Sequence, residues 1–392
     1  MIYFVTLFIL LVPVLIYDFM EREQGKRLWY YAELLILIFL VGLRYRVGGD
    51  TLVYIELFDD YPTFTELFDF DFVSADFNPL WYVFNAIIKS IWNDFTFFQI
   101  VHAVVVNGVF FWFFRKYTKY FFTAIVLYYI PFYLLYNTEV LRESLAVCVL
   151  MLSFSLLLKR KYFKYFICCL IALGFHYSAL MLFVIPFILS LPKISWKITL
   201  LAFGLLFVVL SVSNLGGILQ NVFSANAGMS FKVDAYTVGG FFDVVNVRGV
   251  LANVLPIILL LYVNQNTGEK SNMQNNEFII NFKVHNLLFV YAMFACITMF
   301  VPTMFMRLQN YIVPFYIIVL ASLVIPAINS PSDKQKLLHK ILLIFTTVWF
   351  LFFGFRMYWG DDSNEVNDSI FLDRYYPYYS VFDPTEHPLR EN

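Results

Sequence analysis

The chain has 392 residues, of which 61% are hydrophobic and 14% are charged. Soluble domains are nearer half apolar and about 25% charged, so this composition excludes an ordinary water-soluble globule and predicts a protein that faces lipid. The net charge of −1 gives no indication of a nucleic-acid partner, and we expect none.

Apolar stretches long enough to cross a membrane, or nearly so, recur along the chain. The stretch 79–92 is too short to span and carries Asn85 and Lys89, so we predict an interfacial or re-entrant helix there. A break at Gly174-Phe175-His176 divides the region 162–191 into two short helices. We therefore predict about twelve transmembrane helices, at residues 1–18, 28–43, 96–114, 120–136, 140–158, 162–174, 177–191, 197–213, 247–264, 284–301, 308–328 and 337–356.

Most of the 27 Lys and Arg residues fall in alternate short loops, for example those at 22–27, 115–119 and 159–164. Cytoplasmic loops collect Lys and Arg, so the pattern predicts which loops face the cytoplasm. The fold class we predict is an all-α integral membrane protein with one transmembrane domain, 1–356. Both termini then face outward, as do the long segments 44–95 and 214–246 and a C-terminal tail, 357–392.

This topology brings polar residues from distant segments to one membrane face. A charge within a spanning segment costs about 2.5–3.5 kcal/mol on insertion scales, so such residues are usually functional. Glycines beside an arginine pair also let backbone N–H groups approach an anion closely. The candidates for substrate binding or catalysis are Arg44, Arg46, Asp50, Tyr54, Glu139, Arg142, His176, Arg248, Arg307 and Tyr311.

Arginine suits phosphate, because its planar guanidinium forms paired hydrogen bonds and keeps its charge. A lipid-linked sugar pyrophosphate lies at the depth of these residues, and its transfer reaction leaves a pyrophosphate anion that arginines can neutralise. Either His176 or Glu139 could be the base, and Asp50 could orient an arginine or sugar hydroxyls. We expect neither a metal ion nor a cofactor.

Simpler explanations stay open at each position. An arginine at a helix end often extends to the lipid headgroups, which is the explanation we favour for Arg356, Arg374 and Arg390. Glu139 and Arg142 are three residues apart and would share a helix face as an internal ion pair. His176 could be a satisfied polar group at a helix break. The acidic residues between Asp59 and Asp76 are most simply a solvated loop.

Several motifs resemble those of one family. The run Gly42-x-Arg44-x-Arg46-x-Gly48-Gly49-Asp50-Thr51-x-x-Tyr54 resembles the N-terminal motif of the EpsG family, Wzy-like polysaccharide polymerases of bacterial inner membranes. Further matches lie at Glu139-x-x-Arg142-Glu143, Phe175-His176-Tyr177-Ser178-Ala179, Arg307 with Tyr311, and Tyr376-Pro377-Tyr378-Tyr379-Ser380-Val381-Phe382. No motif covers 197–300, so Arg248 is chosen from its position alone.

The resemblance implies a repeat-unit polymerase with a GT-C-like bundle of helices in the bacterial inner membrane. Such an enzyme transfers a growing capsule, exopolysaccharide or O-antigen glycan from undecaprenyl pyrophosphate to a lipid-linked acceptor, on the periplasmic side. The expected partners are undecaprenyl-pyrophosphate-linked oligosaccharides and membrane lipids, with a chain-length regulator and a flippase of the same pathway.

Three alternatives remain from the residues alone. One is an outer-face glycosyltransferase with a polyprenyl monophosphate donor, in which Asp50, Asp59 and Asp60 could act with a metal ion. Another is a ligase that transfers finished glycan to a different acceptor. The third is a flippase, which would require ionisable residues near the bilayer midplane and paired broken helices.

Overall fold

The computed structural model describes residues 2–72, 74–212, 256–264, 275–298, 302–329, 334–356 and 374–385. In these ranges the regular elements are helices, and the only β-type pairing is isolated bridges of Ser380 with Arg44 and with Asp383. The predicted all-helical class is therefore confirmed. The chain divides into two compact units, residues 1–184 with 350–392 and residues 185–349, which are described separately.

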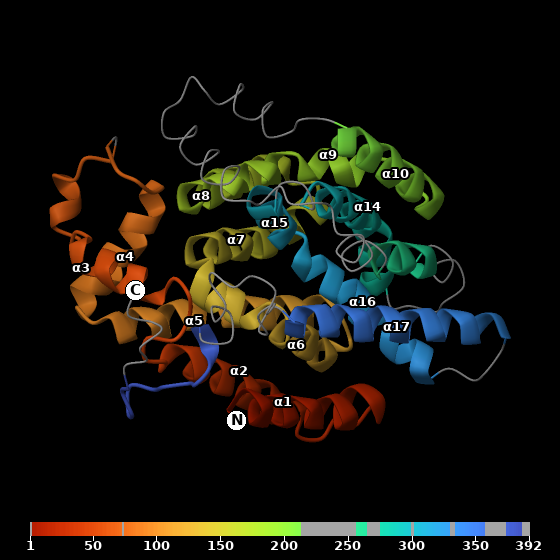
Figure 1. Cartoon of the computed structure of the whole chain (residues 1–392), viewed down its shortest axis with the longest axis horizontal. Coiled ribbons are helices and arrows are strands. Elements are labelled where there is room, and N and C mark those ends of the chain that lie inside the picture. Colours follow the sequence, from red (N-terminus) through yellow and green to blue (C-terminus); the bar gives the residue numbers. More distant parts are fainter. Residues whose placement is uncertain are drawn as a thin grey trace. The chain divides into compact units, whose positions relative to one another are not determined.

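The first unit packs its helices around α5 and α7 (Figure 1). Large aromatic side chains, among them Phe110, Phe113 and Tyr128, are fully buried between these helices. Its elements are α1 (Ile2–Pro13), η1 (Val14–Phe19), α2 (Lys26–Gly42), α3 (Thr51–Asp60), η2 (Glu66–Phe68), α4 (Pro79–Ile91), α5 (Phe95–Tyr117), α6 (Phe121–Tyr129), η3 (Leu135–Glu139), α7 (Leu141–Leu158), α8 (Tyr162–Phe175) and η4 (Tyr177–Phe183).

Three helical segments in the described residues are long and apolar enough to cross a membrane: Ile2–Phe19, Phe95–Tyr117 and Leu141–Leu158. Shorter apolar helices cover Tyr162–Phe175, Tyr177–Ser190, Trp196–Ser211, Val284–Thr298, Val313–Asn329 and Leu337–Phe352. Together these helices fit a multi-pass membrane protein, whereas the count of twelve spans stays a prediction. The predicted break at His176 is confirmed, since α8 ends at Phe175 and a 3₁₀ helix follows.

Helices α3 and α4 lie together at one end of the first unit, beside the start of α5 (Figure 1). Lys89 in the last turn of α4 donates to the carbonyl oxygens of Phe58, Asp59 and Tyr61 at 2.7–3.0 Å. The last carbonyls of a helix have no partner within the helix, so the ammonium of Lys89 caps the end of α3. Trp81 Nε1 also donates to the Tyr61 hydroxyl at 2.9 Å, which joins the same two helices.

A buried amide network holds the π-helical segment η3. Asn107 Nδ2 in α5 donates to Asn137 Oδ1 at 2.9 Å, and Asn137 Nδ2 donates to the Tyr128 hydroxyl at 3.0 Å and to the Tyr133 carbonyl at 2.7 Å. Lipid offers no alternative partner to a polar group, so these bonds strongly favour one conformation. Single π-helical turns are frequent at functional sites, and this one ends at Glu139.

The second unit is organised around α14. Asn286 Nδ2 donates to the carbonyls of Ile188, Leu191 and Pro192, and Asn286 Oδ1 accepts from Ile194 N at 3.0 Å. These bonds fasten the connection after α9 to α14. The elements of this unit are α9 (Ile185–Ser190), α10 (Trp196–Val212), a helical segment at 256–264, α14 (Asn275–Thr298), α15 (Pro302–Asn310), α16 (Val313–Asn329) and α17 (Lys334–Arg356), whose last residues belong to the first unit.

We predict that Lys89→Met loosens α3. The variant leaves three carbonyl oxygens without their charged donor, which should cost about 1 kcal/mol locally because the site is partly exposed. Hydrogen exchange of the α3 amides in the purified protein should speed up severalfold, while the exchange of α7 stays unchanged. Lys164→Met, at an exposed lysine, is the control, and equal α3 exchange in both variants would contradict the capping role.

Candidate functional site

The segment that follows α2 is shaped by Arg44. Its side chain is buried, with Nε donating to the Val47 carbonyl at 3.0 Å and Nη1 to the Val41 carbonyl at 2.6 Å. Burial lowers the pKa of Arg44 to about 10, so the guanidinium stays charged at neutral pH. Arg44 thus closes the turn at the end of α2. The half-buried Arg46 follows in a left-handed conformation, with φ of 52°.

Gly48 and Gly49 bring this segment against η3. Gly48 has a φ of +116°, and a Cβ there would lie 2.6 Å from Thr51 Oγ1 and 2.7 Å from Thr138 Cβ. A Cβ at Gly49 would lie 2.9 Å from Glu139 Oε2 and from Arg374 Cδ and Nε. Gly48 therefore needs glycine, because L side chains rarely adopt its φ and two threonine side chains approach it closely. At Gly49 a Cβ would have to displace the ends of the Arg374 and Glu139 side chains.

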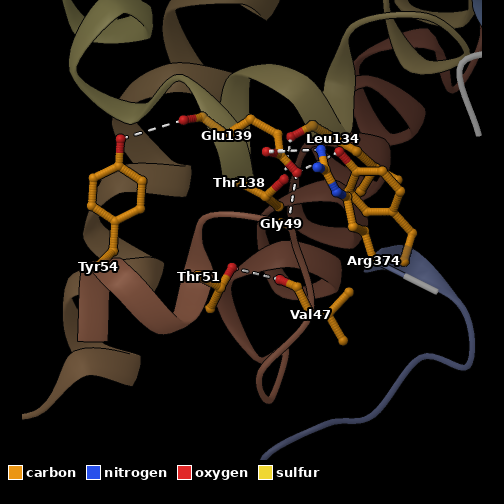
Figure 2. Close-up of polar contacts among 9 residues, drawn as sticks. Val47, Gly49, Thr51, Tyr54, Leu134, Thr138, Glu139 and Arg374 are labelled. Atoms are coloured by element: carbon orange, nitrogen blue, oxygen red, sulfur yellow. Dashed lines mark hydrogen bonds and ion pairs between the residues drawn. The ribbon is translucent and has the colours of Figure 1, made fainter. Parts of the chain in front are cut away.

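Glu139 is the centre of a cluster contributed by three distant segments (Figure 2). Its Oε1 accepts hydrogen bonds from Gly49 N and from the Tyr375 hydroxyl, both at 2.7 Å. Arg374 Nη1 lies 3.9 Å from Oε2, and the Tyr54 hydroxyl donates to the Glu139 carbonyl at 3.3 Å. The structure therefore brings the predicted residues Glu139 and Tyr54 together, and places Asp50 beside them as the exposed N-cap of α3.

The C-terminal tail completes this cluster. Gly48 N donates to the Arg374 carbonyl at 2.8 Å, Tyr45 N to the Tyr379 carbonyl at 2.9 Å, and Val381 N to the Leu43 carbonyl at 2.9 Å. The Tyr378 hydroxyl also donates to Leu40 O at 2.9 Å. The tail is thus paired along the segment that follows α2.

Arg374 and Tyr375 are site residues that the sequence analysis missed. Arg374 was assigned to lipid headgroups, and Tyr375 lies one residue before the Pro-Tyr motif. The side chain of Arg374 instead lies within 4 Å of a carboxylate whose own side chain is 11% exposed. The only signal in the sequence for a role of Arg374 was its position two residues before the Pro-Tyr motif of the tail.

Arg142 lies on the aromatic ring of Phe77, in the segment that precedes α4. Its guanidinium carbon is 4.0 Å from the centroid of the Phe77 ring, a close cation–π distance. In the described part of the chain its Nε is buried without a hydrogen-bond partner.

Burial raises the pKa of Tyr61, and the nearby charge of Arg142 opposes that shift. Because Tyr61 is linked to Trp81, which contacts the Tyr54 ring, aromatic side chains connect Arg142 with the Glu139 cluster.

His176 stands at the end of α8, next to the segment that carries Phe77. Asn78 Nδ2 donates to the Leu173 carbonyl at 2.8 Å, which attaches the start of α4 to this end of α8. The Nδ1 atom of His176 accepts from Ser178 N at 3.2 Å and lies 2.6 Å from Ser178 Oγ. Acceptance at Nδ1 places the proton of the neutral imidazole on Nε2, so His176 is arranged as a hydrogen-bond donor at that atom.

Two local expectations are wrong. Glu139 and Arg142 do not share a helix face, because η3 ends at Glu139 and α7 begins only after Val140, whose φ of −108° and ψ of 50° break the helix. The predicted helix at 308–328 is interrupted, because Arg307 lies in the last turn of α15 and the buried Tyr311 follows in the turn before α16. Arg307 and Tyr311 belong to the second unit, and Arg248 lies outside the described residues.

The acidic residues that would bind a metal in the alternative glycosyltransferase are separated by a helix. Asp50 precedes α3, and Asp59 and Asp60 end it, so about 13 Å of helix lies between them. No group of three or more His, Cys, Asp or Glu side chains in the described ranges is arranged to hold a metal ion. The alternative in which Asp50, Asp59 and Asp60 act together with a metal ion is therefore not supported.

We predict that Gly48→Ala destabilises the protein. The added Cβ meets Thr51 and Thr138 at a φ that L-residues avoid, so the loss should exceed about 1 kcal/mol. Gly108→Ala in α5 is the matched control, because a Cβ there has nothing within 4 Å. The midpoint of heat-induced aggregation in detergent should fall for the first variant only. A Gly48→Ala protein as stable as wild type would contradict the requirement for glycine at this position.

Comparisons with known proteins identify the family. The family model described as EpsG family matches residues 27–380. No curated protein and no solved structure gives a significant match. The matched range contains the turn at Arg44, Glu139, Arg142, His176, Arg374 and Tyr375. Since the match covers nearly the whole sequence, the chain belongs to the EpsG family.

Proposed function

We propose that this protein is a polysaccharide repeat-unit polymerase. It transfers a growing glycan from undecaprenyl pyrophosphate to the acceptor sugar of a lipid-linked repeat unit. The family is associated with polymerase-like functions in polysaccharide synthesis. The observation that carries the proposal is the meeting of Glu139, Arg374 and Tyr375, with Arg142 three residues farther along the chain. A carboxylate beside an arginine, with a second arginine three residues along the chain from that carboxylate, suits a reaction that removes a proton and releases a pyrophosphate.

The arginines would bind the leaving group. During transfer, the bond between the anomeric carbon and the pyrophosphate oxygen breaks, and its electron pair leaves with the oxygen. Arg142 suits the resulting charge because Phe77 holds one face of its guanidinium, which orients the donor edge for phosphate oxygens. Arg46 is a further proposed ligand of the pyrophosphate, while Arg44 maintains the turn. We propose no role for Arg248 beyond its expected position.

Glu139 is the better candidate for the base. Its Oε1 is fixed by two short hydrogen bonds, whereas Oε2 faces Arg374 at 3.9 Å, a separation beyond hydrogen-bond range. The acceptor hydroxyl would give its proton to Oε2 as its oxygen attacks the anomeric carbon from the opposite side, which inverts the configuration. His176 is arranged to donate from Nε2 and would stabilise a sugar or phosphate oxygen.

The setting of the reaction is also proposed. Apolar helices of membrane length would enclose the polyprenyl tail, in a bundle of the GT-C kind. The alternation of basic loops in the sequence supports a site on the periplasmic face of the inner membrane. Asp50 and Tyr54 would contact the sugars. A flippase supplies substrates on that face, and a chain-length regulator acts on the product, so both are proposed neighbours.

We predict that Arg142→Lys abolishes polymer formation. Lysine keeps the charge, but its ammonium cannot reproduce the planar fork or the flat contact with Phe77. In a strain that lacks the chromosomal gene, the variant should give single lipid-linked repeat units and a polymer yield at least about a hundredfold lower, as for loss of a preorganised transition-state contact.

Arg22→Lys, at an exposed arginine, is the matched control and should give a normal ladder. Variant and control must accumulate in the membrane at equal levels, as measured by immunoblot. A normal ladder from Arg142→Lys would refute the role of Arg142. Products that are one sugar longer than the unit would indicate a monosaccharide transferase instead.

A further inference from the structure

The two oxygens of Glu139 have different partners. Oε1 is held by Gly49 N and the Tyr375 hydroxyl at 2.7 Å each. Oε2 faces the guanidinium of Arg374 at 3.9 Å, which is close enough for charge attraction but too long for a hydrogen bond. The carboxylate is therefore anchored on one side, and its other oxygen is neutralised by a cation that does not bind it tightly.

The backbone of Arg374 is fixed although its side chain is one-third exposed. The Arg374 carbonyl accepts from Gly48 N at 2.8 Å, and the Tyr375 carbonyl accepts from the Tyr3 hydroxyl at 3.1 Å. The side chain of Arg374 is 33% exposed, compared with 11% for Glu139. A long side chain on an anchored backbone can change partner without moving the tail.

We infer that Arg374 is exchanged between Glu139 and the pyrophosphate of the donor, so that donor binding uncovers the catalytic base. The inference rests on the proposed function. A pyrophosphate carries more charge than one carboxylate and accepts paired hydrogen bonds from arginine, so it draws Arg374 away from Oε2. Glu139 then becomes available only when a donor is present, and the donor binds before the acceptor.

The exchange also accounts for the proton and the leaving group. The acceptor hydroxyl transfers its proton to Oε2 as its oxygen bonds to the anomeric carbon, and Arg374 neutralises the pyrophosphate that departs. Tyr375 is a positioning residue, because its hydroxyl donates to Oε1 and thereby directs Oε2 toward the incoming hydroxyl. Gly49 makes room for the exchange, since a Cβ there would lie 2.9 Å from both Arg374 and Oε2.

The test measures the binding of undecaprenyl pyrophosphate to the purified full-length protein in nanodiscs, together with polymer formation in cells. Arg374→Gln should weaken binding about tenfold, as expected for one charge-assisted contact, and should lose polymer. Glu139→Gln should also lose polymer, yet bind about tenfold more tightly than wild type, because no carboxylate then competes for Arg374. The double variant should bind no more tightly than Arg374→Gln alone.

Two tyrosine variants separate positioning from structure. Tyr375→Phe should bind the lipid as wild type does but make at least about tenfold less polymer, the cost of one lost hydrogen bond to a charged group. Tyr376→Phe, at an exposed neighbour, should retain both properties. A merely structural role for Tyr375 would lower binding and turnover together.

The outcomes distinguish failure of the inference from failure of the function. The exchange would be overturned if Glu139→Gln bound undecaprenyl pyrophosphate no more tightly than wild type, or if Arg374→Gln bound it normally. The proposed polymerase function would survive these results if Arg142→Lys bound the lipid poorly. Two results together would overturn both proposals. Purified wild-type protein would fail to bind undecaprenyl pyrophosphate, and deletion of the gene would leave the polysaccharide ladder unchanged.

Discussion

The carboxylate of Glu139 joins three parts of the chain that are otherwise far apart. Gly49 reaches it from the segment after α2, and Tyr375 and Arg374 reach it from the tail, 236 residues away in the case of Tyr375. A carboxylate that is mostly removed from water needs other hydrogen-bond donors, and these segments provide them. The same bonds that satisfy its charge fix the direction of its second oxygen, so the requirements of solvation and of catalysis are met by one arrangement.

The helix interruption before α7 is what makes this arrangement possible. A continuous helix would place Glu139 and Arg142 on one face, where the two would neutralise each other. The π-helical segment held by Asn107 and Asn137 ends at Glu139 instead, and Val140 breaks the helix. Glu139 therefore turns toward the tail and Arg142 toward Phe77. The buried amides of the core thus determine which partner each charged residue meets.

Much of the outline could be predicted from the sequence, because apolar composition and helix breakers act locally. The break at His176 follows from a glycine and polar residues that interrupt an apolar run, and the short helix α4 follows from an apolar stretch of limited length. Arg142, His176 and Glu139 were recognised as candidates because charged or polar groups are costly at their positions.

Other features depend on contacts that no local pattern encodes. The burial of Arg44 against two carbonyls follows from how the tail covers it, and the role of Arg374 follows from pairing between residues 43–48 and 374–381. A lone arginine in a polar tail has no periodicity from which such pairing can be inferred. The end of α15 at Asn310, which places Arg307 in its last turn, has no local signal in the sequence.

The most direct measurement is an experimentally determined structure of the protein in nanodiscs with undecaprenyl pyrophosphate bound. The proposed mechanism predicts the diphosphate between Arg142 and Arg374, with the Arg374 guanidinium on a phosphate oxygen and Glu139 still held by Gly49 N and the Tyr375 hydroxyl. A diphosphate bound at the opposite membrane face, or one bound while Arg374 remains on Glu139, would contradict it.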